Sequence, residues 1–130
     1  MRLAGKVAIV TASTRGIGLA CTQRLAREGA TVYMAARNME RAENRAKELN
    51  DEGCNVKTVY NDATEKETYT SMVEEVCKNE GRIDILVNNF GTSNPQKDLD
   101  IKNTEYDEFI RTVDINLASV FMTSQAVIPH

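Results

Sequence analysis

The chain has 130 residues, the size of one ordinary domain, and its 42% hydrophobic and 27% charged residues exclude the disordered and fibrous classes. A net charge of -3 with scattered lysines and arginines argues against a nucleic-acid partner. No stretch approaches the roughly 18 apolar residues of a membrane span.

Three cysteines, Cys21, Cys54 and Cys77, lie far apart and lack the C-x-x-C spacing of a zinc or redox site. We therefore expect reduced thiols and no metal. The first residues also lack the apolar core of a signal peptide, which favours the cytoplasm.

The predicted elements alternate from the start of the chain. Residues 7–11 are a short apolar run rich in β-branched residues, as in a strand buried on both faces. A helix follows and stops at Gly29, and residues 31–35 repeat the strand pattern. A second helix ends before Gly53, and residues 56–60 predict a third strand. The apolar stripe of the first helix is Ile17, Ala20, Cys21 and Leu25, and that of the second is Ala42, Ala46 and Leu49.

The second half begins with Thr64 to Glu67, which matches a capping box at the start of a third helix. Residues 83–87 predict a fourth strand, and residues 92–103 a loop. Thr104 to Asp107 resemble another capping box, before one long last helix. The apolar stripes are Tyr69, Met72, Val73 and Val76 in the third helix, and Tyr106, Phe109, Ile110, Val113, Leu117, Val120 and Phe121 in the last.

Strands alternating with helices predict a Rossmann-type, doubly wound α/β fold with a parallel sheet and helices on both faces. We expect one unit over residues 1–130, with strand order 3-2-1-4. Four strands make about half of such a sheet plus the first strand beyond its switch point, so the sheet is expected to be incomplete. Strand four would then be an exposed edge, and the apolar face of the last helix would lack neighbours.

The turn after the first strand has the composition of a phosphate-binding loop. Small residues with glycine at the start of a helix let the backbone approach a diphosphate, which meets free amides and the positive end of the helix dipole. The alternative is glycine used only for a tight connection. We predict cofactor contacts from Thr11, Ser13, Thr14, Arg15, Gly16, Ile17 and Gly18.

The end of the second strand indicates which dinucleotide binds. An acidic residue there would bond the adenosine ribose and favour NAD, but this strand ends in Ala35-Ala36-Arg37. The guanidinium groups of Arg37 and Arg15 suit a 2'-phosphate, so the sequence predicts NADP. The alternative is that both arginines are ordinary surface charges.

These segments resemble the short-chain dehydrogenases/reductases over essentially all 130 residues. The turn resembles their T-G-x-x-x-G-I-G motif with Ala12 at the first glycine, which requires a backbone conformation that tolerates a Cβ. Asn88-Asn89-Phe90-Gly91 resembles N-N-A-G, with Phe90 reshaping the nicotinamide-ribose side. The resemblance implies that the cofactor also meets the adenine-contacting Asp62 and Ala63, and Asn89, Phe90 and Gly91 after the fourth strand.

The resemblance further implies hydride transfer between NADP(H) and a small-molecule alcohol or ketone. Asn116 aligns with the asparagine that holds a water in the family's proton relay, although a structural role is equally open. The catalytic tyrosine and lysine lie in Y-x-x-x-K, and none of the four tyrosines here matches it. We expect the chain to end before the catalytic serine and to be inactive alone.

Within the family, the same segments and the ending Ile128-Pro129-His130 are similar to bacterial 7α-hydroxysteroid dehydrogenases, which act on bile acids with NADP(H). That similarity implies a steroid bordered by Ser93, and relatives commonly pair into homo-oligomers through the last helix. The alternatives are another family reductase, such as a 3-oxoacyl-acyl-carrier-protein reductase, and a catalytically silent nucleotide-binding fragment or pseudoenzyme. A flavodoxin-like or receiver module would not account for Asn88, Asn89 or Arg37.

Overall fold

The computed structural model describes residues 1–130 and contains a four-stranded parallel sheet in the order β3-β2-β1-β4. The predicted order is therefore confirmed, with β4 at an edge. β4 is shorter than predicted, because it begins at Ile85 rather than at residue 83. The strands are β1 (Val7–Thr11), β2 (Thr31–Ala36), β3 (Asn55–Tyr60) and β4 (Ile85–Val87).

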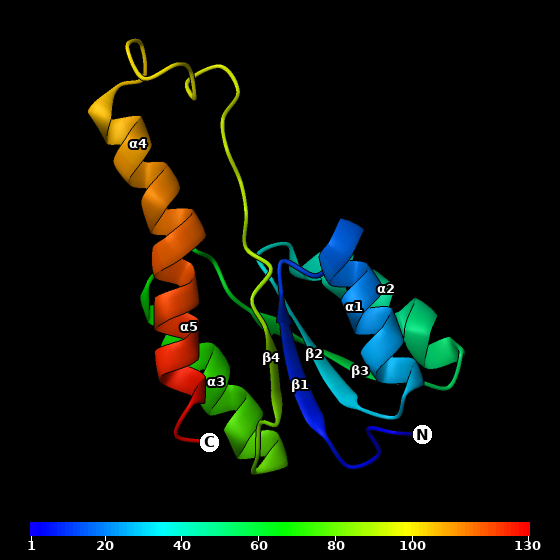
Figure 1. Ribbon diagram of the computed structural model, residues 1–130. Helices are drawn as coiled ribbons and strands as arrows, with labels where there is room; N and C mark the ends of the chain where they lie inside the picture. Colours follow the sequence, from blue (N-terminus) through cyan, green and yellow to red (C-terminus); the bar gives the residue numbers. More distant parts are fainter.

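Helices cover both faces of this sheet, as predicted (Figure 1). α1 (Gly16–Arg27) and α2 (Met39–Asp51) cover one face, and α3 (Glu67–Glu80) covers the other together with the end of the last helix. Successive strand residues point to opposite faces, so Ile9 and Val10 belong to different apolar clusters. The core is thus two layers separated by the sheet.

α1 buries only part of the predicted stripe: Cys21 and Leu25 are half-buried and pack against the core. Ile17 is 74% exposed and Ala20 is also exposed, whereas Gly18, Thr22 and Ala26 are buried. The prediction followed apolar residues, but the helix lies close to the sheet and brings its small residues against it. Ile17 therefore remains exposed in the glycine turn, residues 12–18.

Neither predicted capping box forms. α3 begins at Glu67 without a side-chain cap, because Thr64 donates its N–H and its hydroxyl to Asp62 Oδ1 at 2.8 and 2.7 Å. An aspartate that binds the backbone two residues later competes with a cap. Thr104 likewise donates its hydroxyl to the Asp100 carbonyl, and the next helix starts without a side-chain cap.

The predicted long last helix is interrupted by a π turn. It consists of α4 (Tyr106–Val113), the π segment η1 (Asp114–Ala118) and α5 (Ser119–Val127). Its apolar face lacks neighbours, as expected, with large side chains that are at least 37% exposed. No helix in the structure is both long and apolar enough to cross a membrane. The exposed side chains are Tyr106, Phe109, Ile110, Val113, Leu117 and Phe121.

Candidate functional site

A cavity of about 300 Å³ lies where the carboxyl ends of the strands meet α4 and η1. In open α/β sheets this edge is the usual place for a ligand, since the loops after the strands converge there. The wall is made by residues that follow all four strands and by two residues of the last helix. They are Ala12, Arg37, Asp62, Ala63, Thr64, Phe90, Gly91, Thr92, Arg111 and Ile115.

The glycine turn is packed tightly against its own helix on one side. A Cβ on Gly18 would lie 2.3 Å from the Ala12 carbonyl oxygen and 2.7 Å from Asn89 Nδ2, so only glycine fits. Gly16 has a φ of +58° and nothing within 4 Å of its absent side chain, so its backbone borders open space. A bound diphosphate requires a backbone that it can approach closely, as the open space at Gly16 allows.

Ala12 adopts the left-handed conformation, with a φ of 49°. The family's motif has glycine at this position, and an L-residue in this region is strained. The sequence led us to expect a conformation that tolerates a Cβ. The structure instead retains the glycine-like one and places alanine in it.

Polar side chains fasten the turn to the neighbouring strands. Thr11 Oγ1 accepts from the Asn89 N–H at 2.9 Å and donates to the Val87 carbonyl at 3.3 Å, and Asn89 Nδ2 donates to the Ala12 carbonyl at 3.1 Å. Ser13 Oγ is buried and donates to the Ala35 carbonyl at 3.4 Å. Because these hydroxyls bind other backbone groups, they position the turn; their predicted cofactor contacts stay a prediction.

Arg37 and Asp62 border the cavity from the ends of β2 and β3. Arg37 is exposed and has no hydrogen-bond or ion-pair partner in the structure. Desolvation acts to raise the pKa of Asp62, but the hydrogen bonds from Thr64 and the charge of Arg37 together lower it. The cavity therefore carries one unpaired guanidinium beside an ionised carboxylate.

Many of the predicted contacts do not line this cavity: Thr11, Ser13, Thr14, Arg15, Gly16, Ile17, Gly18, Asn89 and Ser93 are absent from its wall. Thr14 is half-buried in the turn, Arg15 is exposed and makes no side-chain hydrogen bond, and Ser93 is exposed on the loop after β4. Arg15 precedes the first residue of α1, so its side chain extends from the helix start into solvent. Nothing in the structure joins Arg15 to Arg37.

Phe90 contributes to the cavity wall and also packs behind it. Its ring meets that of Tyr69 on α3 edge to face, with centroids 6.2 Å apart. This geometry is the favoured one for aromatic pairs. Part of the Phe90 ring, which replaces the alanine of the motif, thus packs against α3.

Asn116 lies in the π segment and clamps the loop after β4. Its Oδ1 accepts from the Thr92 N–H at 2.9 Å, and its Nδ2 donates to the carbonyls of Thr92 and Thr112, both at 2.8 Å. π turns recur at functional sites, where they redirect a side chain within a helix. The amide is occupied by protein groups, so it positions Thr92, and its predicted role in a proton relay stays a prediction.

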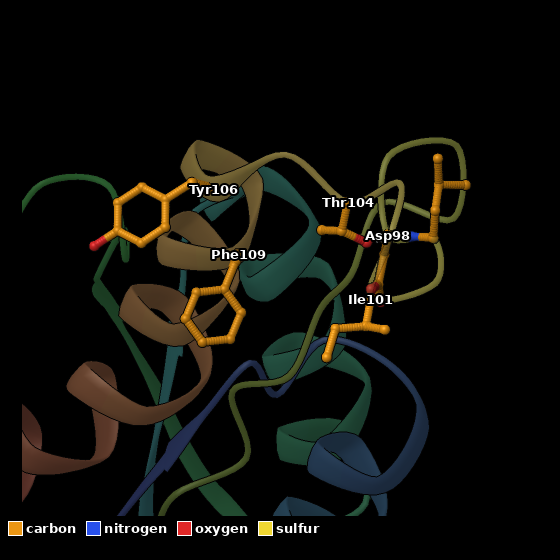
Figure 2. Close-up of a pocket in the computed structure, with 6 residues that line it drawn as sticks. Asp98, Ile101, Thr104, Tyr106 and Phe109 are labelled. Carbon is orange, nitrogen blue, oxygen red and sulfur yellow. Dashed lines mark hydrogen bonds between the residues drawn. The ribbon is translucent and has the colours of Figure 1, made fainter.

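Sequence reasoning missed the contribution of the last helix, because Arg111 and Ile115 belong to no motif. A larger cavity, of about 420 Å³, lies between the loop before α4 and the start of α4. Figure 2 shows residues that line it, among them Ile101, Thr104 and Phe109. This cavity shares no residue with the predicted site.

The residues of the first cavity, together with the glycine turn that reaches it through Ala12, fit a dinucleotide. Gly16 leaves open space beside a helix start, Arg37 offers a free guanidinium, and Asp62 has a second oxygen that Thr64 does not occupy. The open backbone at Gly16 suits the diphosphate, and the guanidinium of Arg37 suits the 2'-phosphate. The free oxygen of Asp62 can accept a hydrogen bond from the adenine amino group. The cofactor itself would supply the hydride chemistry.

Comparison with known proteins agrees with this geometry. The chain is 52% identical over 129 residues to the 7alpha-hydroxysteroid dehydrogenase of Clostridium sardiniense, covering 99% of this chain and 49% of that protein. It is 35% identical over 130 residues to the 3-oxoacyl-acyl-carrier-protein reductase of Thermotoga maritima, covering all of this chain and 52% of that protein. The chain thus spans about half the length of these relatives.

A solved structure gives the same result for the fold. The crystal structure of a metagenomic short-chain oxidoreductase in complex with NADP superposes with a TM-score of 0.91 at 27% identity, over 99% of this chain and 57% of that one. The profile described as short chain dehydrogenase matches residues 6–130. The chain belongs to the short-chain dehydrogenase family.

Proposed function

We propose that the chain is the NADP(H)-binding part of a short-chain alcohol dehydrogenase or ketoreductase. The observation that carries this proposal is Arg37, which has no ion-pair partner and borders the same cavity as Asp62. β2 ends without a carboxylate to bond the ribose hydroxyls, and a guanidinium suits a 2'-phosphate. The NADP complex of the structural neighbour supports the same cofactor.

Binding to the purified 130-residue chain tests this proposal. NADPH and NADH would be titrated by nucleotide fluorescence, with wild type and Arg37→Gln compared. We expect wild type to prefer NADPH by at least about tenfold, because a charge-assisted contact to phosphate contributes about 1.5 to 3 kcal/mol, and Arg37→Gln to lose most of that preference. Arg41→Gln, one turn into α2, is the control. An equal preference in wild type and Arg37→Gln would refute the assignment.

For the whole protein we propose oxidation and reduction at the 7α position of a bile acid, from the identity to the clostridial enzyme. The loop with Ser93 would border the steroid. Asn116, on the last helix, would keep this loop in place through its hydrogen bonds to Thr92. The similarity to the 3-oxoacyl-acyl-carrier-protein reductase supports a second candidate, a carrier-bound ketone. A catalytically silent nucleotide-binding chain is the third.

We further propose that residues 1–130 form one cofactor-binding unit of a cytoplasmic protein. Two copies would pair through the exposed apolar side chains of α4 and α5. Analytical ultracentrifugation of wild type and Phe121→Asp tests this pairing: a dimer that dissociates on substitution supports it, and a monomeric wild type contradicts it.

A further inference from the structure

The last helix supplies one wall of the proposed cofactor cavity. Arg111 and Ile115 are four residues apart, so they lie on the same side of the helix, and both border the space that Arg37 and Asp62 border from the sheet. The sheet side already has groups suited to the 2'-phosphate and to the edge of the adenine. The helix side has only these two side chains.

The guanidinium of Arg111 is held in place by Glu108. Its Nε donates to both Glu108 oxygens at 3.2 and 3.1 Å, and its Nη2 donates to Oε1 at 2.7 Å. Glu108 is only 8% exposed, and Arg111 lowers the pKa of its carboxyl, so the pair is ionised at neutral pH. Nη1 of Arg111 has no acceptor in the structure.

This pairing decides which part of the cofactor Arg111 suits. Arg37 has no ion-pair or hydrogen-bond partner, so its guanidinium is free to bind a phosphate. The charge of Arg111 is offset by Glu108, which leaves a fixed, planar group with three free N–H donors, two on Nη1 and one on Nη2. A planar guanidinium packs well on an aromatic ring and donates to ring nitrogens.

We propose that Arg111, fixed by Glu108, binds the adenine ring of the cofactor from α4, opposite Asp62 and Ala63. This inference rests on the proposed function and adds a binding residue to that site. Adenine is common to NADPH and NADH. Loss of the contact therefore weakens both cofactors by the same factor, whereas loss of Arg37 acts on NADPH alone.

The test measures the Kd of NADPH and NADH for Arg111→Met and Arg111→Lys. Met keeps the length of the side chain without the donors, and Lys keeps the charge without the plane. We expect both variants to raise both Kd values by about three- to tenfold, with an unchanged NADPH to NADH ratio. Arg45→Met is the matched control, because Arg45 also pairs with a glutamate three residues away, on α2.

A rise in Kd confined to NADPH would overturn the inference, because Arg111 would then contact the 2'-phosphate. Unchanged Kd values in variants that melt like wild type would also overturn it. If wild type binds neither nucleotide, the proposed function fails together with this inference. Only the adenine contact fails if wild type prefers NADPH to NADH, Arg37→Gln loses this preference, and the Arg111 variants keep the wild-type Kd values. Thermal melts of all variants identify any that do not fold.

Discussion

Replacing Gly18 with alanine tests the packing of the glycine turn. The added Cβ would lie 2.3 Å from the Ala12 carbonyl oxygen and 2.9 Å from Ser13 Cα, and both atoms belong to the backbone. Relieving such overlap by backbone shifts costs about 1 to 3 kcal/mol. Alanine returns up to about 1 kcal/mol through its higher helix propensity. The expected net loss is about 1 to 2 kcal/mol.

For a chain of this length that loss corresponds to a fall of about 3 to 8 °C in Tm, measured by circular dichroism. Gly91→Ala is the control, because its Cβ would lie at an ordinary distance of 3.6 Å from Asn116 Oδ1. We expect this control to melt within about 2 °C of wild type. A Gly18→Ala variant that melts at the wild-type temperature would refute the packing argument.

Three further predictions concern strain, charge and chemistry. Ala12→Gly should raise stability by about 0.5 kcal/mol in urea unfolding, since relief of the strained φ outweighs the added chain entropy; destabilisation would contradict this. Asp84 has its pKa lowered to about 2 by Arg82 and by the N–H of Val7, so its stabilising effect is present above about pH 4 and lost toward pH 2. Asp84→Asn should accordingly be less stable than wild type at pH 7, with a difference that closes on acidification; a constant difference would contradict the assignment. The pure 130-residue chain should show no NADP-linked oxidation of a 7α-hydroxy bile acid, and detectable turnover would show that the machinery does not need Y-x-x-x-K.

The strand order and both helix layers could be predicted because they follow from the alternation of apolar runs with helical stripes. Ile9 and Val10 show why this works: a strand buried on both faces has no polar residue to mark a side, and only helices on both faces can cover it. The cavity residues after the strands could be located for the same reason, since parallel strands end at one edge.

The remaining features depend on contacts that no local pattern records. Thr64 binds Asp62 instead of capping α3, and Asn116 in the π segment binds Thr92, 24 residues earlier. Arg111 borders the cavity only because the last helix lies beside the loops that follow the strands. Arg15 is exposed beside the start of α1, and its predicted contact with the 2'-phosphate stays a prediction.

A structure of the chain bound to NADP would test the account most directly. We predict that the 2'-phosphate lies within hydrogen-bond distance of Arg37, with the diphosphate at Gly16 and the adenine between Asp62 and Arg111. A nucleotide bound elsewhere, or one with its 2'-phosphate in solvent away from Arg37, would contradict the central claim.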